Sequence, residues 1–142
     1  MLKKIAVGSD HAGYDLKQKT IEYLQAKDFE IFDAGTGSKE SCNYPEFAQK
    51  VADAVACDEA DMGVLICGTG IGMSMAANRN PKVRAALCST MLHARMARRH
   101  NNANILCMGA RITGLDLALA ILEEFLANEF EGGRHDNRVK MF

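Results

Sequence analysis

Short apolar runs alternate along the chain with longer segments in which apolar residues recur every three or four positions. The runs are rich in small and branched residues, which is typical of strands buried on both faces of a sheet. They predict five strands, at Lys4–Gly8, Glu30–Asp33, Gly63–Cys67, Val83–Cys88 and Asn104–Met108.

Helices are expected between and after these strands, near Tyr14–Ala26, Pro45–Cys57, Gly72–Asn78, Thr90–His100 and Leu115–Asn128. The last helix has the clearest pattern, a single buried stripe made by Leu115, Ala118, Leu119, Leu122, Phe125 and Leu126. Strands that alternate with helices predict a Rossmann-like α/β fold, in which helices cover both faces of a five-stranded parallel sheet as a three-layer α/β/α structure.

No repeat, low-complexity tract or linker divides the 142 residues, so residues 1–142 are expected to form one domain. The segment Glu131–Phe142 differs in composition, because it is polar and its second and third residues are Gly132-Gly133. It is interpreted either as a frayed end or as a functional C-terminal arm.

Charged residues make up 25% of the chain, hydrophobic residues 48%, and the net charge is −1, which is the balance of an ordinary globular protein. The sequence lacks the basic excess of a nucleic-acid-binding protein, any apolar run of the ~18 residues that a membrane span needs, and the core of a signal peptide. We therefore expect a cytoplasmic protein without a nucleic-acid or membrane partner. The five cysteines form no C-x-x-C pair and are expected to be reduced thiols, neither disulfides nor a zinc site.

Ligands of open parallel sheets bind beyond the carboxyl ends of the strands. The first predicted strand leads into Ser9-Asp10-His11, the third into a loop that runs from Cys67 through Gly68, Thr69, Gly70 and Ile71 to Gly72, and the fifth into Gly109-Ala110-Arg111. The loop glycines allow a tight turn with exposed amide N–H groups, which suit a phosphate or a developing oxyanion. The loop is not the dinucleotide-binding fingerprint, which would need a glycine where Met73 stands. A purely structural turn is therefore the alternative interpretation.

Cys67 comes at the junction of strand and loop, where amide donors can stabilise its thiolate and make it a usable base. A buried packing role is the alternative for Cys67, and it is the preferred interpretation of Cys57, Cys88 and Cys107.

His100 ends a predicted helix and can both give and take protons, or act simply as a cation at the helix end. His93, on the same helix, is assigned to packing or to the surface.

Arg134 and Arg138 are four residues apart, so one helical turn would place both on one face as a phosphate clamp. A solvated basic tail is the competing interpretation.

Taken together, five segments resemble the ribose-5-phosphate isomerase B family, which also contains allose- and galactose-6-phosphate isomerases. They lie in order over nearly the whole chain: Gly8–Gly13, Asn43–Pro45, Ile66–Ser74, Arg99–Asn104 and Glu131–Val139. The resemblance implies a three-layer α/β/α fold, a role in pentose phosphate metabolism, and a homodimer or homotetramer whose site lies partly across the subunit interface. It implies no metal and no organic cofactor.

The resemblance also implies roles for individual residues. Cys67 would accept the proton, His100 would help to open the sugar ring, and Asp10, Tyr44 and Asn101 would contact the sugar. The groups around the phosphate and the loop would be His11, Gly68, Thr69, Gly70, Ile71, Gly72, Ser74, Arg111, Arg134 and Arg138. Some members use a glutamate at the position of Met73 as the base, and many have an aspartate at the position of Asn43.

The expected reaction is therefore the isomerisation of ribose 5-phosphate to ribulose 5-phosphate through an enediolate, with Thr69 assisting the proton relay. Allose 6-phosphate or galactose 6-phosphate is the alternative substrate. A non-catalytic nucleotide-binding module is the alternative of a different class, and it predicts a thermal shift with nucleotide. A phosphoacceptor switch domain is excluded, because it needs an aspartate where Cys67 stands.

Overall fold

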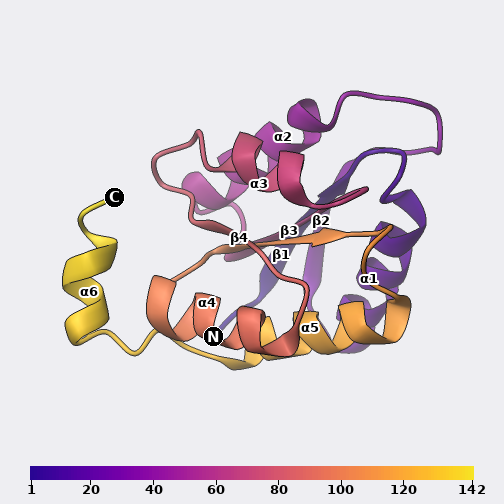
Figure 1. Cartoon of the computed structure of the whole chain (residues 1–142). Coiled ribbons are helices and arrows are strands. Elements are labelled where there is room, and N and C mark those ends of the chain that lie inside the picture. Colours follow the sequence, from indigo (N-terminus) through magenta and orange to yellow (C-terminus); the bar gives the residue numbers. More distant parts are fainter.

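A five-stranded parallel sheet forms the centre of the protein in the computed structural model, which describes residues 1–142 (Figure 1). Its strands lie in the order β2-β1-β3-β5-β4, with bounds β1 (Lys4–Ser9), β2 (Glu30–Gly35), β3 (Met62–Cys67), β4 (Ala85–Leu87) and β5 (Ile105–Gly109). β3 pairs with β1 on one side and β5 on the other, and all of its residues are buried. The strand that ends in Cys67 is therefore the middle of the sheet.

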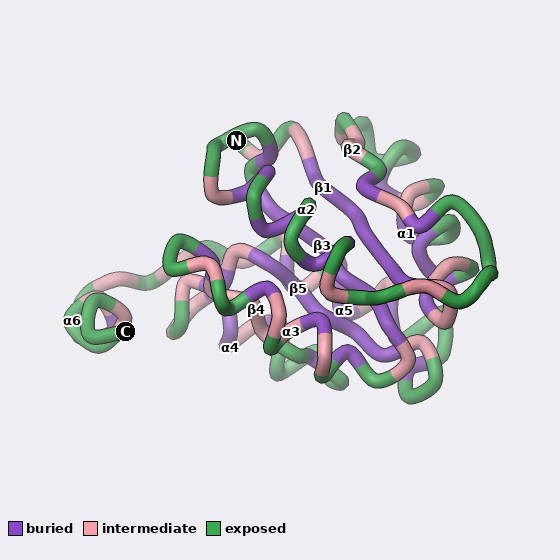
Figure 2. Tube along the Cα trace, turned by 90° about the horizontal axis from the view of Figure 1, so that it is seen from above, coloured by how far each residue is buried: buried purple, intermediate pink, exposed green.

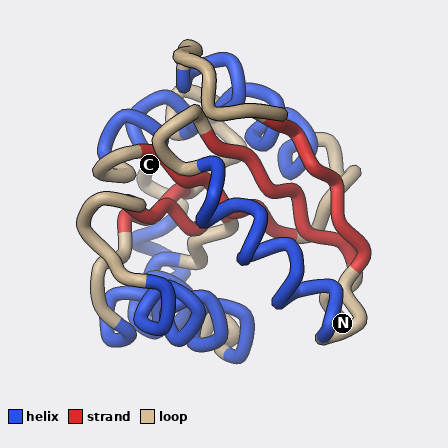
Figure 3. The backbone as a smooth tube through the Cα atoms, turned by 90° about the vertical axis from the view of Figure 1, so that its right-hand side faces the viewer, coloured by secondary structure: helices blue, strands red, loops and turns tan.

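Six helices accompany the sheet: α1 (Tyr14–Ala26), α2 (Tyr44–Ala56), α3 (Ile71–Ala77), α4 (Met91–Asn101), α5 (Leu115–Ala127) and α6 (Arg134–Val139). Helices α1, α4 and α5 cover one face, and α2 and α3 cover the other (Figures 1 and 3). Side chains alternate along each strand, so each face has its own apolar core. The predicted α/β/α architecture is confirmed.

Buried residues follow the three central strands, β1, β3 and β5, whereas the edge strands β2 and β4 and the outer sides of the helices are more exposed (Figure 2). In α5 the residues that enter the core fully are Ala118, Ile121, Leu122 and Phe125. The expected stripe was wrong at its first residue, because Leu115 begins the helix at the rim of the sheet and is 43% exposed. None of the helices is long and apolar enough to cross a membrane.

β4 is shorter than predicted. It covers Ala85–Leu87, whereas a strand over Val83–Cys88 was expected. Side-chain amides hold the chain where the strand was expected to begin: Arg84 N–H donates to Asn104 Oδ1 at 2.7 Å, and Ala85 N–H donates to Asn78 Oδ1 at 2.8 Å. Asn78 also donates to the Ala85 carbonyl at 2.9 Å. This amide bridge occupies the open edge of the sheet, where a further strand could otherwise pair. The other predicted strands and helices begin and end within two residues of their observed limits.

The C-terminal arm, residues 131–142, is helical over α6 rather than frayed. Gly132 and Gly133 both have positive φ, +67° and +57°, which side chains tolerate poorly, and they turn the chain sharply before Arg134. The arm projects from the end of the molecule that lies away from the carboxyl ends of the strands (Figure 1).

Candidate active site

Cys67 is the last residue of β3 and is 5% exposed. The backbone N–H of Gly70 donates to its Sγ at 3.2 Å. Gly70 adopts φ +80°, and a Cβ there would come within 2.8 Å of the Met108 backbone, so this turn requires glycine. The loop therefore presents a fixed amide donor to the sulfur, an arrangement that stabilises a thiolate.

The other cysteines differ from Cys67 in their surroundings. Burial raises the pKa of the Cys88 thiol to about 12 and raises that of Cys107 well above its ordinary value, so both are packing residues at neutral pH, as predicted. The prediction was wrong for Cys57, which comes directly after the last residue of α2 and is exposed. Cys42 is half-buried, with its Sγ 3.9 Å from Nδ1 of His11.

The residues of the glycine loop form a compact turn before α3. Thr69 Oγ1 accepts the N–H of Ile71 at 3.2 Å, and Ser74 Oγ donates to the Ile71 carbonyl at 2.7 Å. The Tyr44 ring lies against Gly72, because a Cβ on that glycine would fall 2.4 Å from the ring. The absence of a side chain at position 72 thus allows Tyr44 to reach the loop.

Charged groups from two other strands lie beside this turn. Arg111, after β5, has its guanidinium next to Gly68, where a Cβ would be 3.2 Å from Nη1. Asp10, after β1, is 7% exposed, and its Oδ1 accepts the Gly13 N–H at 3.1 Å. The neighbouring His11 accepts the Cys42 N–H on Nδ1 at 3.3 Å.

These residues lie together at the carboxyl edge of the sheet and include most of the predicted site residues. We call this group the thiol cluster. Its members are Asp10, His11, Tyr44, Cys67, Gly68, Thr69, Gly70, Ile71, Gly72, Ser74 and Arg111.

The remaining predicted residues form the arm cluster, which consists of His100, Asn101, Arg134 and Arg138. α4 begins beside the carboxyl end of β4 and runs back over its 11 residues, about 16 Å, to end just before β5. His100 and Asn101 therefore lie at the opposite edge of the sheet from Cys67, and α6 packs at that end of α4. One chain does not bring the two clusters together.

Two further residues, to which the sequence assigned no role, lie against the arm cluster. The ring of His135 stacks on that of His100, with centroids 4.1 Å apart and planes 12° apart. Glu131 Oε1 lies 3.7 Å from His100 Nε2, and another Glu131 oxygen lies 3.3 Å from Arg99 Nε. Glu131 is tied to α4 by its backbone N–H, which donates to the Arg99 carbonyl at 3.0 Å, and the turn at Gly132-Gly133 then brings His135 onto His100. Residue spacing does not predict that turn.

His100, Glu131 and His135 have potential metal-ligand atoms within 4.8 Å of one another. Because the imidazoles are stacked, their lone pairs lie in nearly parallel planes and do not converge on one point, as the ligands of a zinc ion must. We therefore describe this group as a ring stack with an ion pair rather than as a metal centre.

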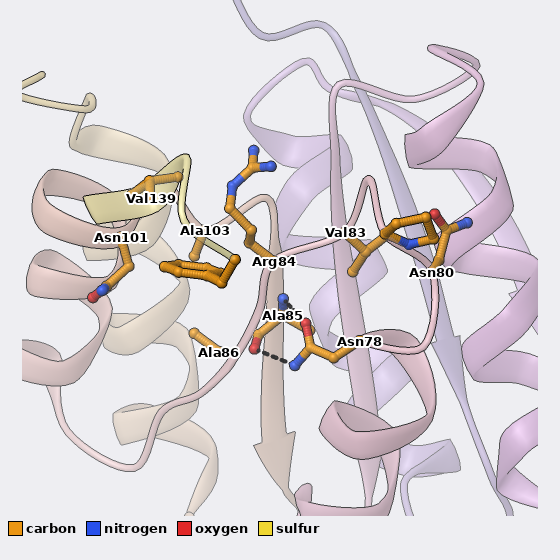
Figure 4. A pocket seen from close by; sticks show the side chains of 11 residues that line it. Asn78, Asn80, Val83, Arg84, Ala85, Ala86, Asn101, Ala103 and Val139 are labelled. Carbon is orange, nitrogen blue, oxygen red and sulfur yellow. Dashed lines mark hydrogen bonds between the residues drawn. The ribbon is translucent and has the colours of Figure 1, made fainter. Parts of the chain in front are cut away.

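The largest pocket, about 490 Å³, lies beside the arm cluster and not at Cys67. Asn101 and Val139 stand on one side of it, and Arg84 lies between them and Asn80 (Figure 4). A second pocket of about 250 Å³ adjoins the glycine loop and is lined by Thr69, Ile71, Leu87, Cys88, Ser89, Gly109, Ile112 and Thr113. The molecule thus has a recess near each cluster.

A cysteine that accepts a backbone N–H at the end of the middle strand, with basic groups beside it, is an arrangement suited to a small anionic ligand in an α/β protein. Residues 5–142 match the family model described as Ribose/Galactose Isomerase. The chain is 46% identical to ribose-5-phosphate isomerase B of Escherichia coli over 139 residues, which cover 98% of this chain and 93% of that protein.

Solved structures of two relatives share the fold. Ribose-5-phosphate isomerase B of Clostridium thermocellum has a TM-score of 0.97 and 51% identity, over 97% of this chain and 93% of that one. The ribose 5-phosphate isomerase of Thermotoga maritima has a TM-score of 0.96 and 50% identity, over 98% and 96%. The chain therefore belongs to the ribose/galactose isomerase family, and it is an isomerase.

Proposed function

We propose that the protein interconverts ribose 5-phosphate and ribulose 5-phosphate, with Cys67 as the base. The observation that carries this proposal is the N–H of Gly70 directed at the buried Cys67 sulfur, in a chain whose close relatives bear the name of that enzyme. Allose 6-phosphate and galactose 6-phosphate are the competing substrates.

The reaction follows from the groups available. His100, with Asp10, transfers the proton that opens the furanose ring to the free aldehyde. The Cys67 thiolate then removes the proton from carbon 2, the C–H electrons form the C1–C2 double bond, and the carbonyl oxygen becomes an enediolate oxyanion. Loop N–H groups stabilise that charge. Cys67 returns the proton to carbon 1 while the electrons of the carbon-2 O–H bond form the ketone C=O. The hydroxyl proton passes to the oxyanion on oxygen 1, with the Thr69 hydroxyl in the relay, so the reaction balances without a redox cofactor.

Kinetics on three sugar phosphates test the substrate. We expect kcat/KM for ribose 5-phosphate to exceed the values for allose 6-phosphate and galactose 6-phosphate, each assayed in the aldose-to-ketose direction. A higher value for either hexose phosphate would reassign the substrate. No turnover of any of the three would reject the isomerase mechanism proposed for Cys67.

We further propose that a second copy of the chain completes the site, as a homodimer or as a pair of dimers. The separation of the two clusters supports this, because His100 can act on a sugar near Cys67 only if it comes from another subunit. Exposed apolar side chains flank the glycine loop, among them Ile71 (51%), Met75 (68%) and Ile112 (65%). An apolar patch beside the thiol cluster is what a subunit interface would cover.

In this arrangement the substrate phosphate lies between His11 and Arg111 of one subunit and Arg134 and Arg138 of the other. Both arm arginines are exposed in the single chain, which leaves their guanidiniums free to bind an anion. Tyr44 and Asn101 then contact the sugar.

Replacing Arg138 tests the phosphate clamp. We expect Arg138→Ala to raise KM for ribose 5-phosphate about tenfold or more while kcat changes little, since a hydrogen bond to a charged group contributes about 1.5–3 kcal/mol. Lys140→Ala is the control, because Lys140 is a cation of the same arm that pairs with Asp136 at 2.6 Å. An unchanged KM in the Arg138 variant would remove this residue from the clamp.

We also propose a cytoplasmic location. The five cysteines are all free thiols, and such a set is typical of proteins from a reducing compartment.

A further inference from the structure

The imidazole of His100 is held from two sides by residues outside the proposed catalytic set. On one side the carboxylate of Glu131 lies 3.7 Å from Nε2. On the other the ring of His135 covers its face at a centroid distance of 4.1 Å. A histidine on the last turn of a helix can otherwise exchange between staggered χ1 rotamers and rotate broadly about χ2.

Both supporting residues are themselves fixed. The Glu131 N–H donates to the Arg99 carbonyl at 3.0 Å while its carboxylate meets the Arg99 side chain, so its backbone and side chain are both tied to α4. His135 is 6% exposed, and its N–H donates to the Gly132 carbonyl at 3.1 Å. The ring that covers His100 is thus the one buried side chain of α6.

Burial and the charges around the stack favour the neutral form of the His135 ring. Burial lowers the pKa of His135, and His100, Arg134 and Arg138 lower it further, while Glu131 opposes them. His135 is therefore neutral at pH 7. Its Nε2 is buried and has no hydrogen-bond partner, so the ring serves by its shape and not by a polar contact.

From this geometry we propose that Glu131 and His135 are positioning residues that hold the His100 ring in the orientation needed for ring opening. The inference rests on the proposed function of His100. Since Glu131 faces Nε2, the other nitrogen, Nδ1, is left to meet the substrate.

Two variants of His135 separate ring position from imidazole chemistry. We expect His135→Ala to lower kcat about tenfold with KM within twofold, because misplacing a catalytic group slows the chemical step. His135→Phe keeps a flat ring and loses no hydrogen bond, so it should retain at least half of the native kcat. Glu131→Gln should lower kcat without changing KM, and Asp136→Asn, a matched change of an α6 carboxylate that pairs with Lys140, should have no effect.

A spectroscopic measurement on the ligand-free protein gives a result that does not depend on turnover. A ring stacked on His100 shifts its Cε1–H proton resonance upfield by ring current. We expect this resonance to move downfield in His135→Ala, to remain upfield in His135→Phe, and to be unaffected in the surface control His93→Phe.

Four outcomes would overturn the inference: an unchanged His100 resonance in His135→Ala, a His135→Phe variant that is folded but as slow as His135→Ala, a rise in KM instead of a fall in kcat, or a native kcat in Glu131→Gln. The third outcome would mean that His135 only supports the arm that bears Arg134 and Arg138. Failure of the proposed function appears separately, as a wild-type protein that turns over no sugar phosphate.

Discussion

Cys67→Ala is expected to lower kcat for ribose 5-phosphate by a factor of about 10²–10⁴ and to leave KM within a fewfold of the native value. The range is that of a positioned acid or base in proton transfer. Alanine is a small change at this site, because Cys67 lies in the core that faces α2 and α3 and loses only its sulfur. The circular dichroism spectrum and the melting temperature should therefore show a folded protein.

Two further variants make the result specific to the thiolate. Cys67→Ser keeps the shape of the side chain but is a much weaker base, so it should resemble Cys67→Ala. Cys57→Ala removes an exposed thiol and should be fully active. If Cys67→Ala kept near-native turnover, another group would have to be the base, and Met73 offers no titratable side chain to take its place.

Mixing two variants, each nearly inactive when ribose 5-phosphate is kept well below KM, should restore activity at that substrate concentration if subunits share each site. In a dimer of Cys67→Ala with a double variant, Arg134→Ala and Arg138→Ala, one site carries both lesions. The other combines a native thiol cluster with a native arm. Random pairing of equal amounts gives half mixed dimers with one native site each, which amounts to about a quarter of the wild-type activity.

The measurement is the specific activity of co-expressed, purified protein compared with each variant alone. If each chain completed its own site, every site in the mixture would carry a lesion, and the activity would stay at the mean of the two variants. A mixture of Cys67→Ala with Cys67→Ser is the negative control, because no pairing of these chains contains a native thiol cluster.

The sequence was sufficient to predict the sheet and the thiol cluster, because both depend on short-range patterns. Apolar runs predicted the strands, and the carboxyl ends of parallel strands share one edge, so Asp10, Cys67 and Arg111 were expected to lie near one another. The edge strand was misjudged at Val83, Arg84 and Cys88, which lie outside β4; at Arg84 the backbone N–H donates to the side-chain amide of Asn104. Such side-chain bonds leave no periodic signal.

The arm was harder to predict for a different reason. The motif from Glu131 to Val139 was visible, but its position depends on two consecutive glycines with positive φ, and glycine at these positions is compatible with many paths of the chain. The stack of His135 on His100 joins residues 35 positions apart, and no spacing rule connects them. The roles of Glu131 and His135 therefore emerge only from the fold.

The glycine pair separates the part of the chain that holds the proposed base from the part that holds the proposed phosphate anchor. The proposed base is fixed by the buried middle strand, whereas the proposed phosphate anchor is a short helix that follows two glycines with positive φ. Replacements at Arg134 or Arg138 would then change how tightly the substrate phosphate is held while leaving the proposed base in place. Substrate affinity and proton transfer at carbon 2 therefore depend on separate parts of the chain.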